Sequence, residues 1–272
     1  MLQKEERVKQ RDRWACKRCG KKFEDLVLCK FDPTADTDDC YITLCKSCVE
    51  WAGDNFEEAK QLCTKLLQRN KIILVGDCHG NFEKLDAILT AERPFDFFLS
   101  VGDVGSLNDV TPQNLSLIEK WHNGYFVRGN HDNVEFFTPL EIVQTINGIQ
   151  VAALNGMLKS RTFLKEQVNN VSFREVMYLS HLKDVDILVT HQPPTGLFDG
   201  MGEAVLEELL NYLVPNIYIS GHVHRYKFKF HLRTFVISLP MIHKGYVVAY
   251  FQGRDLRNIE IVLKKGKKFI RV

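Results

Sequence analysis

The chain has 272 residues, of which 45% are hydrophobic and 26% are charged, and its formal net charge is +2. These values are ordinary for a globular protein, allow one sizeable domain with a small module, and exclude a net charge large enough to attract nucleic acid by itself. No apolar run has the length of a membrane span and the charged amino terminus lacks the apolar region of a signal peptide, so we expect a cytoplasmic protein with no membrane partner.

Cysteine dominates the first predicted region, residues 1–53, which lacks long apolar runs and is too short for a large core. Two Cys-x₂-Cys pairs stand there with 25 residues between them: Cys16, Cys19, Cys45 and Cys48. In a reducing compartment, four thiolates at this spacing predict one structural Zn²⁺ ion in tetrahedral coordination. Redox-active or disulfide-bonded cysteines are the alternative.

The spacing of the two pairs, with a helix-like sequence after the second pair, resembles a treble-clef finger of the kind found in HNH nucleases. The catalytic His-Asn-His residues of those nucleases are missing, so the resemblance implies a zinc finger without nuclease chemistry. Cations crowd the first pair, which suits a nucleic-acid partner as well as a purely structural finger. They are Lys9, Arg11, Arg13, Lys17, Arg18, Lys21 and Lys22.

A connector helix is predicted over residues 54–70. Apolar residues recur there at helical spacing, at Phe56, Ala59, Leu62, Cys63, Leu66 and Leu67. Residues 71–272 form the third predicted region, in which strand-like runs alternate with helical patterns before the chain turns β-rich after residue 226. This alternation predicts an α/β domain.

Five strand-like runs of the third region each end in residue types that bind metals. The runs stop at Val75, Val101, Val127, Thr190 and Ile219. The residues that follow them include Asp77, His79, Asp103, Asn130, His131, His191, His222 and His224. Because the strands of an open α/β sheet bring their carboxyl ends to one edge, we expect these side chains to form one cluster. Packed carboxylates repel one another unless a cation lies between them, so the cluster predicts a metal site.

The donor atoms of this cluster indicate which ions it binds. Two Asp, one Asn and four His residues suit Mn²⁺, Fe²⁺, Zn²⁺ or Ni²⁺ better than Ca²⁺ or Mg²⁺. Asp103 has two carboxylate oxygens and is able to bridge two ions. In an extended turn, residues two apart point the same way, so Asp77 and His79 are expected to reach one ion, and His222 and His224 stand in the same relation.

Five sequence blocks closely resemble those of the calcineurin-like metallophosphoesterases. They are residues 76–80, 102–105, 129–132, 190–194 and 221–224; they occur in the right order, and the resemblance spans about residues 71–250. It implies two β-sheets packed as an α/β/β/α sandwich. Phosphoprotein phosphatases of this superfamily carry Asp-Arg-Gly after the second block and Asn-His-Glu in the third. This chain has neither, so protein phosphatase activity is not expected.

The same resemblance implies a role for each ligand. One ion would be held by Asp77, His79, Asp103 and His224, and a second by Asp103, Asn130, His191 and His222. A hydroxide that bridges the two ions would attack phosphorus in line, and His131, oriented by Asp132, would protonate the leaving oxygen. For Asp132, simple turn formation is the alternative.

Basic residues near the last block bear on the substrate. Lys227 and Lys229 alternate with aromatic residues, so a strand there would carry its cations on one face. With Arg128 and Arg225 they are the predicted substrate-binding residues, and a solvated edge strand is the alternative. We therefore predict hydrolysis of phosphodiesters, with RNA or DNA as the favoured substrate. Nucleotides or cyclic nucleotides are the first alternative, and a non-catalytic binding module is the second.

Overall fold

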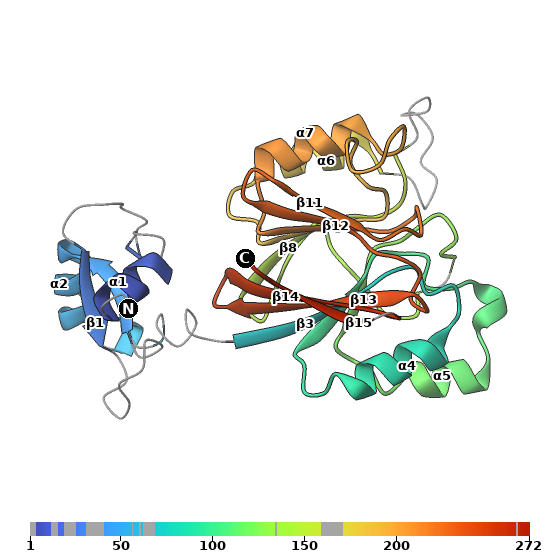
Figure 1. Ribbon diagram of the computed structural model, residues 1–272, viewed down its shortest axis with the longest axis horizontal. Coiled ribbons are helices and arrows are strands. Elements are labelled where there is room, and N and C mark those ends of the chain that lie inside the picture. Colours follow the sequence, from blue (N-terminus) through green and yellow to red (C-terminus); the bar gives the residue numbers. More distant parts are fainter. Residues whose placement is uncertain are drawn as a thin grey trace. The chain divides into compact units, whose positions relative to one another are not determined.

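The computed structural model describes residues 4–11, 16–18, 26–30, 41–55, 57–59, 61, 69–133, 135–158, 171–264 and 266–272. The chain divides into two compact units, Met1–Gln68 and Arg69–Val272 (Figure 1). Residues 56, 60 and 62–68 of the predicted connector lie outside the described residues, and residues 57–59 and 61 within it are helical. Each unit is folded around a core of its own.

Among the described residues of the first unit, two short helices and a two-stranded antiparallel sheet can be given bounds. The elements are α1 (Lys4–Arg11), β1 (Leu26–Lys30), β2 (Tyr41–Cys45) and α2 (Lys46–Asp54), and β1 pairs with β2 along its whole length. The hydrophobic cluster formed by its described residues is small and includes three cysteines; its buried members are Cys16, Leu26, Ile42, Leu44, Cys45, Cys48, Ala52 and Ala59. A core of this size leaves a domain marginally stable unless a metal or a cross-link adds to it.

The second unit contains two mixed sheets. The seven-stranded sheet has the order β15-β14-β13-β3-β4-β5-β6. Its strands are β3 (Arg69–Val75), β4 (Phe97–Ser100), β5 (Gly124–Phe126), β6 (Thr138–Pro139), β13 (Gly245–Gln252), β14 (Asp255–Leu263) and β15 (Gly266–Arg271). The six-stranded sheet has the order β11-β12-β10-β9-β8-β7. Its strands are β7 (Val143–Ile146), β8 (Ile149–Leu154), β9 (Ile187–Thr190), β10 (Ile217–Ser220), β11 (Lys227–His231) and β12 (Thr234–Ser238).

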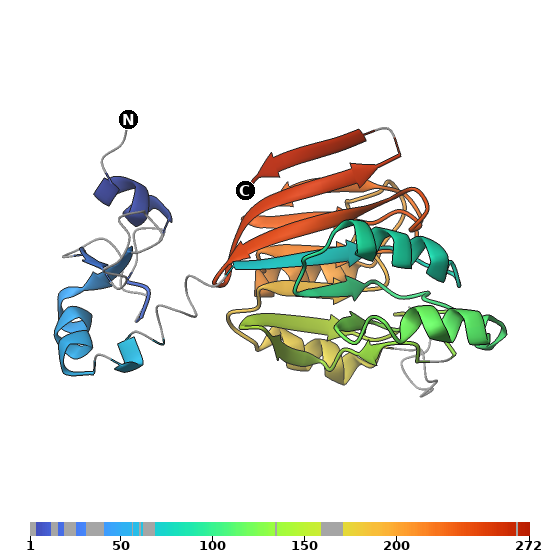
Figure 2. The same cartoon turned by 90° about the horizontal axis from the view of Figure 1, so that it is seen from below.

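Helices cover the outer face of each sheet, as Figures 1 and 2 show. Helices α4 (Phe82–Ala91) and α5 (Pro112–Ile118) lie on the seven-stranded sheet, and α6 (Phe173–Ser180) and α7 (Ala204–Leu213) lie on the six-stranded sheet. Strands β3, β4 and β5 are parallel to one another, as are β8, β9, β10 and β12. The predicted α/β sandwich of two sheets with flanking helices is confirmed.

The central strands are buried on both faces. In β10, Ile217 and Ile219 belong to the core between the sheets, whereas Tyr218 packs in the core beneath α6 and α7. In β4, Leu99 faces the other sheet and Phe98 belongs to the core beneath α4 and α5. Strands enclosed in this way read as continuous apolar runs in the sequence. They also give a rigid base to the loops that leave their ends.

Side-chain caps begin three of the helices that flank the sheets. The side chain of Asn81 accepts a hydrogen bond from the Lys84 N–H at the start of α4, directly after the first sequence block. Thr111 caps α5 in the same way, and Ser172 forms a capping box with Glu175 at the start of α6. Each cap satisfies helix N–H groups that have no partner within the helix. Across the described ranges, no helix combines the length and apolar character that crossing a membrane requires.

Candidate metal centre

The loops after β3, β4, β5, β9 and β10 bring the predicted ligands together. The closest group contains Asp77, His79, Asp103 and His224, whose ligand atoms all lie within 4.8 Å of one another. His224 Nε2 lies 2.8 Å from Asp77 Oδ2 and 3.2 Å from His79 Nε2. These four residues, from three loops, are the set that the family resemblance implies for the first ion.

A second group forms around His191. Its Nε2 atom lies 3.1 Å from Asn130 Oδ1 and 3.4 Å from Asp103 Oδ2, and its ring centre is 5.0 Å from that of His222. His191 Nδ1 lies 2.8 Å from the carbonyl oxygen of Val101, which accepts hydrogen bonds only. Nδ1 therefore carries the proton, and the Nε2 lone pair points toward Asp103 and Asn130, as in metal-ligating histidines whose second nitrogen is held by a carbonyl.

Asp103 lies between the two groups. Its Oδ2 atom is 3.9 Å from His79 Nε2 in the first group and 3.4 Å from His191 Nε2 in the second. Its Oδ1 atom accepts a hydrogen bond of 2.8 Å from the His131 N–H. A carboxylate in this position is suited to bridging two cations.

Four of the ligand residues have left-handed backbone conformations, and these conformations set the directions of their side chains. The sequence does not indicate them. The φ angles of His79, Asp103, His222 and His224 are 46°, 48°, 64° and 56°. The expectation of extended turns is therefore wrong. Because the chain turns at these residues, His222 faces His191 whereas His224 faces Asp77. A non-glycine residue in this region costs about 1–2 kcal/mol, so the surrounding loops must hold the strain.

The two carboxylates of the site are buried, and a bound cation would compensate their charge. Asp77 and Asp103 are 0% and 1% exposed. Burial raises the pKa of Asp77 to about 7, although the nearby His191 lowers it. Burial, together with the neighbouring imidazoles, lowers the pKa of His222 and His224, and the charge of Lys244 adds to this effect on His224. For His191, burial lowers the pKa but the hydrogen bond and charge of Asp103 raise it more, so its net shift is upward. Buried carboxylates beside imidazoles form a donor set that divalent transition metals would stabilise.

Two glycines allow these carboxylates to approach the backbone. A Cβ atom on Gly129 would lie 2.2 Å from Asp103 Oδ1, and a Cβ atom on Gly221 would lie 2.2 Å from Asp77 Oδ1. Any side chain at either position would displace a carboxylate of the centre. This close approach explains why glycine begins the third and fifth sequence blocks.

His131 and Asp132 lie in different environments. His131 is exposed, and its ring centre is 5.5 Å from that of His79. Asp132 is buried, and its carboxylate accepts hydrogen bonds from the N–H groups of Asp103, Val104, Gly105 and Gly129. Only the bond from Gly129 is local to the turn, and the other three join the two ligand loops. The proposed orientation of His131 by Asp132 stays a prediction.

The four predicted substrate-binding cations differ in their contacts. Arg128 donates to the carboxylate of Glu135, and Arg225 is exposed directly after His224. The predicted alternation is present in β11: Phe228 and Phe230 contact Phe235 of the inter-sheet core, and the lysines occupy the other face. Lys227 lies 5.5 Å from the Phe198 ring centre. The ammonium of Lys229 and the carboxylate of Glu207 both lie beside Gly196, which favours a packing role for Lys229.

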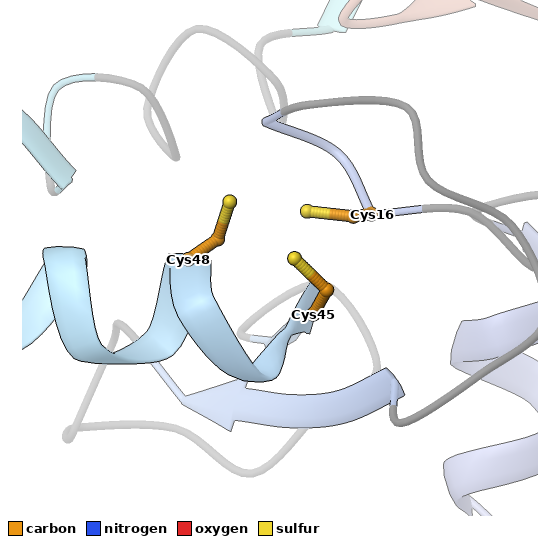
Figure 3. Close-up of side chains that lie close together, drawn as sticks. All are labelled: Cys16, Cys45 and Cys48. Carbon is orange, nitrogen blue, oxygen red and sulfur yellow. The ribbon is translucent and has the colours of Figure 1, made fainter.

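Three of the four predicted zinc ligands meet in the first unit. The Sγ atoms of Cys16, Cys45 and Cys48 lie within 4.8 Å of one another and point inward (Figure 3). Cys19 lies outside the described residues. The guanidinium of Arg18 lies 3.8 Å from the Trp51 ring centre and donates to Cys48 Sγ at 3.6 Å. In the sequence Arg18 is only one of several cations near the first cysteine pair, because its partners are about 30 residues away along the chain.

Comparison with known proteins supplies the family context. The family described as calcineurin-like phosphoesterase matches residues 70–226. A lariat debranching enzyme of Drosophila pseudoobscura pseudoobscura is 22% identical over 57% of this chain and 42% of its own length, so the chain spans less than half of that relative. A dimetal phosphatase from Danio rerio shares the fold with a TM-score of 0.56 at 10% identity, over 74% of this chain and 98% of that protein. The protein TT1561 of Thermus thermophilus gives a TM-score of 0.55 at 14% identity, over 75% and 99% of the two chains.

Proposed function

Because the chain belongs to the calcineurin-like phosphoesterase family, we propose that it hydrolyses phosphodiester bonds of nucleic acid with a pair of divalent metal ions. The observation that carries the proposal is the convergence of Asp77, His79, Asp103 and His224, with Asp103 also reaching His191. A complete donor set of this kind favours catalysis over a binding module that has kept only the fold.

Different residues of the chain would have different roles in such a reaction. Two bound ions would supply Lewis-acid stabilisation of the phosphoryl oxygens and a water molecule of lowered pKa. Asp103 would separate and orient the two ligand groups while its Oδ1 atom holds the backbone of His131. The exposed imidazole of His131 would then donate a proton to the leaving oxygen. Burial of both carboxylates keeps water from competing for their oxygens.

Nucleic acid is the favoured substrate for two reasons. The curated relatives that match this chain are named lariat debranching enzymes, although the match covers 42% of their length. Exposed cations also follow the ligand His224, beginning with Arg225. Both observations support a polyanionic substrate more than a nucleotide or a cyclic nucleotide, which needs few charges beyond the metal pair.

A substrate panel tests this function. The full chain, loaded with Mn²⁺, should hydrolyse single-stranded or branched RNA or DNA with a higher kcat/KM than cyclic nucleotides, and diesters faster than a phosphomonoester. Initial rates at several substrate concentrations supply kcat/KM for each compound. Preference for a cyclic nucleotide would move the assignment to small substrates, and turnover of the monoester alone would contradict the diesterase.

We also propose that Cys16, Cys19, Cys45 and Cys48 bind one structural Zn²⁺. The described part of this unit has only nine buried hydrophobic residues, three of which are cysteines, so a bound metal would supply much of its folding free energy. Replacing Cys45 or Cys48 with serine should remove one zinc per chain and unfold this unit. Zinc content by mass spectrometry and the change in far-UV circular dichroism report the two effects.

Cys29→Ser is the matched control, because Cys29 is half-buried in β1 and does not belong to the three-cysteine cluster. This variant should keep its zinc. Retention of the same zinc content by Cys45→Ser would contradict the site. Formation of a disulfide by the wild-type chain under mild oxidation, without zinc release, would favour the redox alternative.

A further inference from the structure

Five exposed cations lie on segments that follow or flank His224, the ligand of the first metal group that is most accessible, with its side chain 37% exposed. They are Arg225, Lys227, Lys244, Lys264 and Lys268. Arg225 and Lys227 lie just before and at the start of β11, and Lys244 directly precedes β13. The last two follow β14, with Lys264 directly after it and Lys268 in β15. The sequence points only to the first two, because the others are distant from His224 along the chain.

Strand register brings Lys244 and Lys264 to the metal edge. The start of β13 pairs with Val75, the last residue of β3, and with Leu263, the last residue of β14. The turn that joins β14 to β15 therefore lies at the edge from which the first metal-ligand loop leaves β3. Lys264 stands in that turn, and its N–H donates to the carbonyl oxygen of Lys244 at 3.3 Å. Lys244 in turn acts electrostatically on His224.

Lys268 connects this edge with β11. Strands β11 and β15 are the edge strands of the two sheets, and the ammonium of Lys268 lies 4.9 Å from the ring centre of Phe228 (Figure 1). Next along β11, Phe230 is 53% exposed, and its ring is held edge-on against Phe235 with centres 5.3 Å apart. The open side of the sandwich thus carries Lys268 near the metal end and an exposed aromatic ring beyond it, while Lys227 projects from the other face of β11 at the metal end of that strand.

Within the described part of the second unit, these five cations have no acidic partner, a property that they share with several other surface cations such as Lys84 and Lys183. Among the residues that the structure describes, none of the five has a carboxylate oxygen within 4.0 Å of its charged group. By contrast, Lys267 lies 2.7 Å from Glu260, and Lys71 lies 3.0 Å from Glu92. Cations that are clustered and not neutralised produce a positive potential that attracts a polyanion.

We propose that Arg225, Lys227, Lys244, Lys264 and Lys268 form a basic rim that binds the sugar-phosphate backbone of a single-stranded nucleic acid beside the metal centre, with a base stacked on Phe230. Cationic tracks with exposed aromatic rings are the usual device for binding single strands without sequence preference. An acidic protein would use the cations but would have less need of the stacking surface. For its substrate the rim rests on the diesterase function proposed above.

Binding and turnover measured side by side test the rim. The variant Lys264→Glu/Lys268→Glu should weaken binding of a fluorescent single strand of about twelve nucleotides by about tenfold or more. The slope of log binding constant against log salt should fall in magnitude by about 1.4, as expected for two lost phosphate contacts. The ratio of kcat/KM for this strand to kcat/KM for bis-p-nitrophenyl phosphate should fall by a similar factor.

Lys183→Glu/Arg93→Glu is the matched control, because both residues are exposed and stand just before β9 and β4, at the ends opposite to the metal edge. It changes the net charge equally and should leave binding within about twofold. Phe230→Ala should weaken binding by about tenfold with an unchanged salt slope, since it removes stacking and no charge. Thermal unfolding checks that each variant is folded.

The outcomes separate the rim from the diesterase function. Equal binding by the rim variant and the wild type would overturn the rim even if the wild type cleaves the strand. Rim-dependent binding without cleavage of any diester would support the rim and overturn the diesterase. A poly-aspartate peptide that displaces the strand at a lower concentration than unlabelled oligonucleotide would assign the surface to an acidic protein and overturn the proposal.

Discussion

Replacing Asp103 with asparagine should lower kcat/KM for a diester substrate by about a thousandfold, equivalent to about 4 kcal/mol of barrier. Asp103 is the residue that both ligand groups share, with its Oδ2 atom 3.4 Å from His191 Nε2 and 3.9 Å from His79 Nε2. Asparagine offers one neutral oxygen in place of a carboxylate, so it neither compensates two cations nor bridges them. Metal content should fall from two ions per chain toward one or none in the second unit.

Asp186→Asn is the matched control for this prediction. Asp186 is also buried, at the start of β9, where it accepts from Gln150 N–H and lies 2.7 Å from the Arg254 guanidinium, at the opposite end from the ligands. This variant should unfold at a lower temperature but keep its metal content and its kcat. If the Asp103→Asn variant kept full activity and two bound ions, Asp103 would not be a ligand of the metal centre.

Replacing His131 with alanine should lower kcat by about a hundredfold to ten-thousandfold on a nucleic-acid substrate, while the metal content stays unchanged. The leaving oxygen of such a substrate is an alkoxide, which depends strongly on a proton donor. The loss on bis-p-nitrophenyl phosphate should be smaller, because nitrophenolate is a much weaker base. Both rates are measured on the same metal-loaded preparation, and the metal content is determined beside them.

His122→Ala serves as the control, since His122 is an exposed residue just before β5, away from the ligand loops. It should leave both rates unchanged. Equal losses on the two substrates in His131→Ala would contradict the acid role and leave His131 only a positioning function. A fall in metal content would instead make His131 a ligand.

Much of the fold followed from the apolar runs. Strands such as β4 and β10 are apolar at nearly every position because both of their faces are buried, which identified them as central strands of a layered sheet. The edge strand β11 was identified by alternation, because Phe228 and Phe230 face the core and Lys227 and Lys229 do not. Bounds of the first unit were less predictable, since its core is too small to impose a periodic pattern.

The metal centre was predictable as a set of residues but not as a geometry. Strands β3 and β4 are parallel neighbours, so Asp77 and Asp103 had to meet at their carboxyl ends. The expectation that all five strands share one sheet edge is wrong, because β9 and β10 belong to the other sheet, and only the packing of the two sheets brings His191 to these carboxylates. The left-handed conformation of His224 is set by packing of its loop, and a local sequence pattern does not report it. The four hydrogen bonds that Asp132 accepts from backbone N–H groups are likewise not predictable from the sequence, because two separate loops supply the donors.

The sequence by itself determined the fold class and the chemistry of the ligands, because buried strands and donor residues are local features that leave a pattern in the chain. Only the tertiary structure decided how the donors divide, with His224 beside Asp77 and His222 beside His191, and which cations surround them. Lys264 and Lys268 are about 40 residues from His224 in the sequence, and only the pairing of β13 with β14, β14 with β15 and β13 with β3 brings them to the metal edge. Long-range register is the physical reason, since it depends on the whole sheet rather than on any one segment.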